Sequence, residues 1–130
     1  MGLLEQGARQ AAGQQGGARV LIAEDEPAVA ALPALIVEES GYVPLGARNG
    51  AQAPELGRGR HPALLITGLL IPVLGGAGLI AALRDADAAV PAIVVTAMPR
   101  HVAAAGADAV LAQPVEIGQL EALFARFLPL

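Results

Sequence analysis

The sequence predicts an α/β domain in which a doubly wound sheet of five parallel strands lies between two layers of helices. Two observations predict it: short aliphatic runs recur five times along the 130 residues, and helical stretches separate each run from the next. Strands joined by helices pair in parallel through right-handed crossovers, which place helices on both faces of the sheet. The length suits one domain with a core large enough to fold alone.

The N-terminus differs in composition from the rest of the chain. Residues 1–18 consist mainly of Gly, Ala and Gln, so they predict a flexible arm ahead of a folded domain at 19–130. The first strand, 20–23, runs into the acidic loop Glu24-Asp25-Glu26. The other four expected strands are short and aliphatic, and they lie at 42–47, 64–67, 92–96 and 109–112.

Proline and glycine mark the ends of the expected helices. Pro27 suits the first turn of a helix that runs to about Ser40, and Gly41 is a C-terminal stop. Pro33 lies inside this helix and should kink it or remove one hydrogen bond. The remaining helical stretches are a poor one after Asn49-Gly50, one at 77–84, a brief one at 100–105 and a last one at 116–128.

The composition predicts an aliphatic core. The hydrophobic fraction is 55% and the mean hydropathy is +0.56, but 29 of the residues are alanines, which bury little area each. Aromatic residues make up 2%, and the last helix places four large apolar side chains at core spacing: Leu120, Leu123, Phe124 and Phe127. Cysteine is absent, which excludes disulfides and thiolate metal sites.

Charge and targeting signals narrow the class of partner. The net charge is −4, Lys is absent and the eight Arg are scattered, which argues against a nucleic-acid-binding surface. No signal peptide pattern is readable, and we expect a cytoplasmic protein. Residues 62–83 carry no formal charge and are long enough to span a bilayer, so a membrane-associated protein is an alternative. Pro72 and several glycines interrupt this segment, and we therefore expect no membrane partner.

Six segments resemble bacterial response-regulator receiver domains in order and spacing. They are VLIAEDEP at 20–27, GYVP at 41–44, NG at 49–50, LLITGLLIP at 64–72, VPAIVVTA at 90–97 and AGADAVLAQP at 105–114. The resemblance covers residues 19–128 and implies a flavodoxin-like receiver fold with a shortened fourth helix. It also implies a role in two-component phosphorelay signalling. On this resemblance we do not expect the protein to be an enzyme.

The same resemblance implies a degenerate phosphorylation site. In the family, an acidic pair after the first strand binds Mg²⁺ together with a phosphate-accepting Asp and a loop carbonyl. Glu24 and Asp25 match the acidic pair, and the carbonyl would be that of Leu70. Gly68 stands at the acceptor position. Phosphoryl transfer needs a nucleophile, and Mg²⁺ loses affinity with each lost carboxylate, so we expect weak Mg²⁺ binding and no phosphorylation.

Three further positions of the family's switch also have counterparts. Thr96 matches the hydroxyl residue that hydrogen-bonds the phosphoryl group. Gln113, before Pro114, stands where the family has Lys, and Val110 stands where it has an aromatic residue. The resemblance therefore predicts a pseudo-receiver that acts by binding protein partners. The short segment 97–105 should expose the fifth strand and the last helix, and we expect a homodimer through that face of fourth helix, fifth strand and fifth helix.

Other interpretations of these residues remain open. The loop Glu24-Asp25-Glu26 can serve as a solvated cap for the first helix, and Thr96 as a structural hydroxyl. A small flavodoxin-like enzyme would use Glu24 or Asp25 as a general base, although the sequence offers no partner acid, nucleophile or cofactor loop. His61 and His101 lack metal-ligand spacing. A decayed protein is a further alternative, since prolines lie in the first two helices.

Overall fold

The computed structural model describes residues 17–49, 52, 59–69, 75–86, 89–101 and 106–128. Its strands are β1 (Arg19–Ala23), β2 (Val43–Ala47), β3 (Leu64–Gly68), β4 (Ala92–Thr96) and β5 (Ala109–Ala112). Its helices are α2 (Pro27–Glu39), α4 (Gly75–Ala86) and α5 (Ile117–Phe127), with a 3-10 turn, η1, at Pro99–His101.

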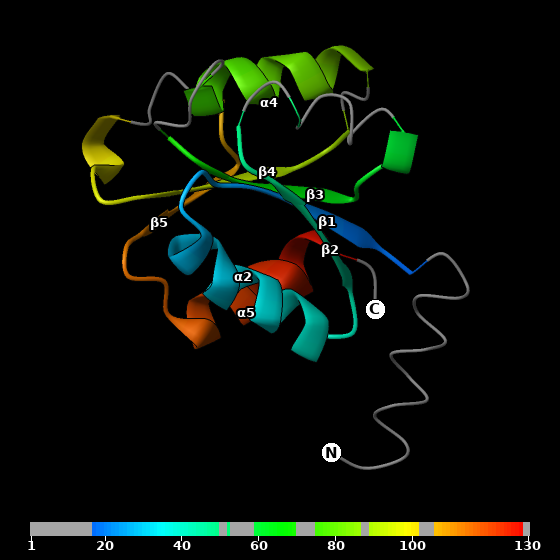
Figure 1. The fold of residues 1–130 in the computed structure, drawn as a ribbon, viewed down its shortest axis with the longest axis vertical. Helices are drawn as coiled ribbons and strands as arrows, with labels where there is room; N and C mark the ends of the chain where they lie inside the picture. Colours follow the sequence, from blue (N-terminus) through cyan, green and yellow to red (C-terminus); the bar gives the residue numbers. More distant parts are fainter. Residues whose placement is uncertain are drawn as a thin grey trace.

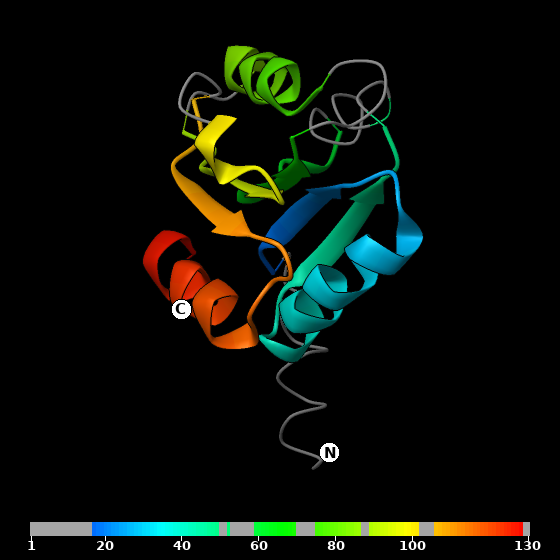
Figure 2. The same ribbon diagram turned by 90° about the vertical axis from the view of Figure 1, so that its left-hand side faces the viewer.

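All five strands are parallel and form one sheet in the order β2-β1-β3-β4-β5. The predicted doubly wound fold is confirmed, with β3 at the centre and β5 at one edge. Figure 1 shows α4 on one face of the sheet and α2 with α5 on the other. The view in Figure 2, turned by 90°, shows the same separation of the helices into two layers.

Alternation along β3 divides the core between these layers. Leu65 packs in a cluster that contains the α4 side chains Leu79 and Leu83. Leu64 and Ile66 point to the opposite face, where the cluster includes side chains of α2 and α5. The second cluster also holds the aromatic residues, and Tyr42 meets Phe124 edge to face with ring centroids 5.9 Å apart. All four apolar residues predicted for the core side of the last helix pack in this cluster: Leu120, Leu123, Phe124 and Phe127.

Helix α2 begins and ends close to the predicted residues. Pro27 occupies its first turn, and Gly41 adopts a φ of +91°, which allows the chain to turn after the helix. Helix α2 continues without a break through Pro33, whose side chain is buried. Because proline has no N–H, the carbonyl four residues earlier receives no helical hydrogen bond from it.

Helix α4 is longer than predicted, since it starts at Gly75 and not at Ala77. Glycine disfavours helix, but a tight contact requires it here. A Cβ atom at Gly76 would lie 2.5 Å from the carbonyl oxygen of Gly68, and the Gly76 N–H donates to the Leu69 carbonyl at 2.9 Å. The first turn of α4 therefore packs directly against the backbone at the end of β3.

Several predictions fall on residues outside this description. They concern residues 1–16 of the predicted arm 1–18, most of the helical stretch after Asn49-Gly50, and residues 102–105 of the shortened fourth helix, of which only η1 is described. The described part of 62–83 forms β3 and the first part of α4. In the described residues, no helix combines the length and the apolar character needed to cross a membrane.

Candidate functional site

The C-terminal ends of four parallel strands meet at one edge of the sheet, and the residues there line a cleft of about 210 Å³. The loop Glu24-Asp25-Glu26 follows β1, Gly68 ends β3, Thr96 ends β4 and Gln113 follows β5. The other lining residues are Leu69, Val95, Ala97 and Met98. This edge is where ligands bind in open parallel sheets.

Backbone hydrogen bonds hold the cleft loops against the strand ends. The Gln113 N–H donates to the Thr96 carbonyl at 3.0 Å, which extends the β4–β5 pairing by one residue. The Glu24 N–H donates to the Ala47 carbonyl at 2.9 Å and holds the acidic loop to the end of β2. The positions of Glu24 and Gln113 are thus set by the sheet itself.

The structure brings together five of the six site residues that the sequence predicts. These are the residues that match the acidic pair, the acceptor, the hydroxyl and the Lys of the family: Glu24, Asp25, Gly68, Thr96 and Gln113. The sixth, Val110, does not line the cleft; it lies on the edge strand β5 and is 39% exposed. The carbonyl of Leu70 belongs to a residue that the structure does not describe. The roles of all these residues remain predictions.

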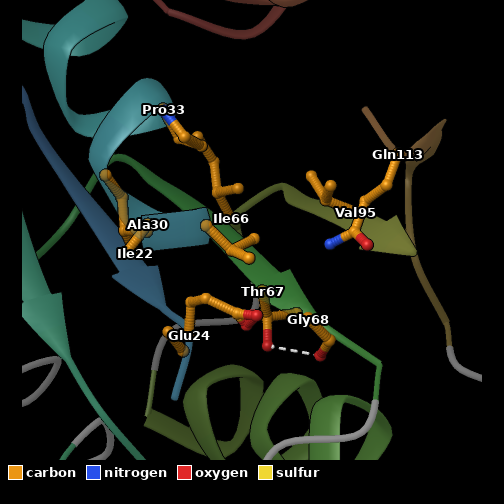
Figure 3. A pocket seen from close by; sticks show the side chains of 11 residues that line it. Ile22, Glu24, Ala30, Pro33, Ile66, Thr67, Gly68, Val95 and Gln113 are labelled. Carbon is orange, nitrogen blue, oxygen red and sulfur yellow. Dashed lines mark hydrogen bonds between the residues drawn. The ribbon is translucent and has the colours of Figure 1, made fainter. Parts of the chain in front are cut away.

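The backbone conformation at position 68 does not require a glycine. Among the described glycines only Gly41, Gly75 and Gly106 have positive φ angles, so a residue with a side chain could adopt the backbone at Gly68. Next to it lies a small cavity of about 20 Å³, room for roughly one water molecule. Figure 3 shows this cavity with Glu24, Thr67 and Gly68 along one side and Gln113 reaching in from beyond β5.

The two threonines at the strand ends already have backbone partners. The buried hydroxyl of Thr67 donates to the Gly68 carbonyl at 2.9 Å (Figure 3). The Thr96 hydroxyl oxygen accepts a hydrogen bond from the Met98 N–H at 2.9 Å, and its side chain is also buried. This contact gives Thr96 a structural role in the loop after β4, while its hydroxyl hydrogen remains able to donate.

The electrostatics of the cleft are dominated by negative charge. Partial burial raises the pKa of the Glu24 carboxyl above its ordinary value, and the neighbouring carboxylates of Asp25 and Glu26 raise it further. Among the described lining residues there is no Arg, and Gln113 contributes a neutral amide. The cleft is therefore suited to bind a cation or a hydrogen-bond donor, and it disfavours an anion.

The described part of the cleft offers Mg²⁺ carboxylates from a single loop. Mg²⁺ needs near-octahedral oxygen coordination, and in proteins it usually keeps several waters and takes one or two carboxylates besides phosphate oxygens. Within the part of the chain that the structure describes, no group of three or more His, Cys, Asp or Glu side chains is arranged to hold a metal. Glu24 and Asp25 come from consecutive residues of one loop, and Gly68 supplies no side chain. Their role as weak Mg²⁺ ligands stays a prediction.

The sequence did not reveal two contributions to the site. Gly76, in the run Gly75-Gly76-Ala77-Gly78, allows α4 to approach the end of β3, and the glycine run was its only signal. Val29 and Pro33 of α2 line the small cavity beside Gly68. The sequence marks Pro33 only as a helix breaker. Its place beside the cavity could not be predicted, because nothing in the local sequence shows which face of a helix meets the sheet.

A search against models of protein families matches residues 20–125 to the response regulator receiver domain. Among sequence relatives, the polar-differentiation response regulator DivK of Brucella anthropi is 29% identical over 105 residues, which cover 75% of this chain and 85% of DivK. The protein DivK of Brucella ovis is 28% identical over the same length.

Solved structures show the same fold. The signal receiver domain of a signal transduction histidine kinase from Syntrophus aciditrophicus is 30% identical, with a TM-score of 0.77, and the match covers 86% of this chain and 90% of that one. The receiver domain of the sensor histidine kinase PA1611 from Pseudomonas aeruginosa has a TM-score of 0.78 at 23% identity, and covers 85% and 97% of the two chains. That structure holds a magnesium ion in its active-site cleft.

Proposed function

This chain belongs to the response regulator receiver domain family, and on that premise we propose that it is a pseudo-receiver, which is not phosphorylated and works by binding a protein partner. A cytoplasmic location is part of the proposal. Signalling through the two-component family is supported by the relatives, whereas the loss of phosphorylation rests on the site residues.

The observation that carries the proposal is the glycine at the end of the central strand. Gly68 lies in the cleft with Glu24, Asp25 and Thr96, where the resemblance expects the acceptor Asp. Phosphoryl transfer to a carboxylate needs that carboxylate in line with the phosphorus atom. The carboxylates that line the cleft follow a different strand, β1, and the family's pattern assigns the pair Glu24 and Asp25 to the cation and not to the phosphate.

The residue after β5 supports the same conclusion. Gln113 lines the cleft where the family has Lys, so the cleft lacks both the acceptor and the cation that would pair with it or its phosphate. A Lys left there without its acceptor would lose its closest partner, whereas an amide can satisfy itself with local hydrogen bonds. An enzyme that uses Glu24 as general base is less well supported, since no Ser, Cys, His or Lys lines the described part of the cleft.

The proposal is tested by incubating the protein with Mg²⁺ and radiolabelled acetyl phosphate. We expect no base-labile acyl-phosphate label on the wild-type chain. The matched variants are Gly68→Asp, which the φ angle of Gly68 permits, and the double variant with Gln113→Lys. Label on the double variant but not on the wild type would assign the defect to these two positions. A stoichiometric label on the wild type overturns the proposal.

Self-association through the β5 edge is a second part of the proposal. We call this surface the β5 face; it comprises Met98, Val110 and the exposed flank of α5 that carries Ala122 and Ala125. Val110 is 39% exposed and Met98 41% exposed. Exposed apolar side chains grouped beside an edge strand are typical of a contact surface.

Light scattering at high micromolar concentration tests this part. We expect a dimer for the wild type and a monomer for Val110→Glu. Leu35→Glu, at an exposed position of α2 outside the β5 face, is the control and should remain dimeric. A wild-type protein that is strictly monomeric would show that the β5 face does not associate with itself.

A further inference from the structure

The small cavity beside Gly68 combines an apolar wall with a few polar groups. Its volume of about 20 Å³ is room for roughly one water molecule. Apolar side chains form most of the wall, among them Ile22, Ile66 and Val95 of the sheet (Figure 3). A cavity lined by such side chains alone stays dry, so the polar groups around it decide what it holds.

Helix α2 brings a backbone carbonyl to this cavity. Pro33 has no N–H, so the carbonyl of Val29, four residues earlier, receives no helical hydrogen bond from it. A helical carbonyl points along the axis toward the residue four positions later, so the Val29 oxygen lies between two residues that both line the cavity. Outside the regular elements, no backbone hydrogen bond between described residues reaches this oxygen. A carbonyl without a partner in a partly buried place costs free energy, which a nearby donor would recover.

The side chain of Gln113 brings a second polar group to the same place. Its backbone N–H is fixed to the Thr96 carbonyl at 3.0 Å, and Figure 3 shows its side-chain amide turned toward the cavity from beyond β5. Within the described parts of the chain, this amide makes no hydrogen bond with another residue. The cavity thus separates a donor on one side from an acceptor on the other by about the width of one water.

We infer that the cavity binds one ordered water molecule, which bridges the Val29 carbonyl and the Gln113 amide. The water donates one hydrogen to the carbonyl oxygen and accepts a hydrogen bond from Nε2 of Gln113. Its other hydrogen goes to the carboxyl of Glu24, which lines the same cavity. These bonds use both hydrogens and one lone pair of the water, and about three bonds are typical of a buried water.

This water joins three elements at the site: the loop after β1, helix α2 and the residue after β5. A bridging water is nearly as favourable in enthalpy as a direct hydrogen bond, so it can hold the Gln113 amide in one orientation. Because Gln113 also lines the acidic cleft, the water fixes one wall of that cleft. The inference goes beyond the proposed function and does not depend on it, since it concerns the free protein.

A groove along α2 gives this water a path to solvent. The groove has a volume of about 360 Å³ and leaves Leu32 36% exposed. It shares Val29, Pro33 and Gln113 with the cavity, so it lies directly outside it. The water therefore exchanges with solvent, but more slowly than a surface water, because partners from three elements hold it.

A crystal structure of the full chain, at a resolution that shows ordered surface waters, tests the site directly. We expect one water in the cavity, within about 2.5–3.2 Å of both the Val29 carbonyl oxygen and Nε2 of Gln113. A cavity without a water, or a Gln113 amide that bonds the Val29 carbonyl directly, would overturn the inference.

Nuclear Overhauser effects between water and side-chain amide protons test it in solution. The Gln113 amide should show the sign of a long-lived water, and the exposed Gln119 on α5 should not. Gly68→Ala should abolish the Gln113 signal, because position 68 lines the cavity and faces the same side of β3 as Ile66, so the added methyl takes the space of the water. Gly118→Ala, whose Cβ meets nothing within 4 Å, is the matched control and should keep the signal.

The role of the Val29 carbonyl has its own pair of variants. Pro33→Ala restores an N–H that bonds this carbonyl within the helix, so the water loses a partner and the Gln113 signal should disappear. Pro27→Ala changes a proline in the first turn of the same helix, where no helical bond is missing, and should keep the signal. A signal that persists in Pro33→Ala, or one that is absent from the wild-type chain, would overturn the bridge.

Discussion

The two ends of the sheet differ in how their charged side chains are paired. At the N-terminal ends of β4 and β5, the guanidinium of Arg84 meets the carboxylate of Asp108 at 2.5 Å. At the C-terminal ends, three carboxylates line a cleft whose described residues include no Arg. Both ends belong to one sheet, so the contrast lies in the side chains that each end carries.

The Arg84–Asp108 end is built as a closed network. Arg84 also donates from Nη1 to the Gly106 carbonyl at 2.6 Å, and the Asp108 carboxylate accepts the Ala92 N–H at 2.8 Å. One ion pair thus ties α4 to the starts of two strands. Its groups are matched within the chain, which is typical of a structural element.

Among the described residues at the cleft end, the carboxylates and the exposed apolar side chains have no comparable ion pair. Partial burial and like charges raise the pKa of Glu24, and the adjoining groove leaves Leu32 partly open to water. Natural proteins depart from local optimisation mainly at functional sites. The comparison teaches that the end without its own counter-charge is the end where a partner is expected.

The largest expected effect probes the close packing beneath the cleft. Gly76→Ala should lower the free energy of unfolding by about 1–3 kcal/mol, because its Cβ would lie 2.5 Å from the Gly68 carbonyl oxygen, a backbone atom that cannot rotate away. Urea denaturation measures this free energy.

The control is Gly118→Ala in α5, where a Cβ meets nothing within 4 Å. Gly118→Ala should raise the free energy of unfolding by about 0.4–1 kcal/mol. Equal stability of the two variants would contradict the packing at Gly76.

The second expected effect breaks the closed network at the other end. Asp108→Ala removes the acceptor of a backbone N–H and of Arg84, and should cost about 1–2 kcal/mol, since partial exposure reduces the value of both contacts. Asp85→Ala, an exposed acid beside Arg84 in sequence, should change stability by less than about 0.5 kcal/mol. Chemical denaturation that finds the two variants equal would show that the ion pair contributes nothing.

The smallest effect concerns the unmatched charge of Glu24. Its pKa is raised in the folded state above the ordinary value of 4.5, so the unfolded chain loses this proton first as pH rises. The free energy of unfolding then falls between the unfolded and the folded pKa and stays lower at neutral pH. Glu24→Gln removes this loss, and should slightly increase stability at pH 7 but not well below pH 4.

Thermal melts at both pH values provide the measurement for Glu24. Glu121→Gln, an exposed position on α5, is the control and should show no such pH-dependent gain. A destabilised Glu24→Gln at pH 7 would mean that this carboxylate has a favourable partner, and that the cleft is not short of positive charge.

The strands, most helix ends and the residues of the cleft were predictable from the sequence, because their signals are local. Short aliphatic runs gave all five strands to within about two residues at each end, and Pro27 and Gly41 marked α2. The convergence of Glu24, Asp25, Gly68, Thr96 and Gln113 followed from a rule about parallel sheets, since strand ends that share a direction share an edge.

Only the tertiary structure decided what lies between the elements. The early start of α4 at Gly75 depends on its packing against the end of β3. The groove along α2 and the Arg84–Asp108 pair depend on contacts between residues far apart in the chain. No local pattern encodes such contacts, because a side chain's partner is chosen by the packing of whole layers. The sequence by itself therefore determined which residues stand at the strand ends, and the fold determined which of their charges find a partner.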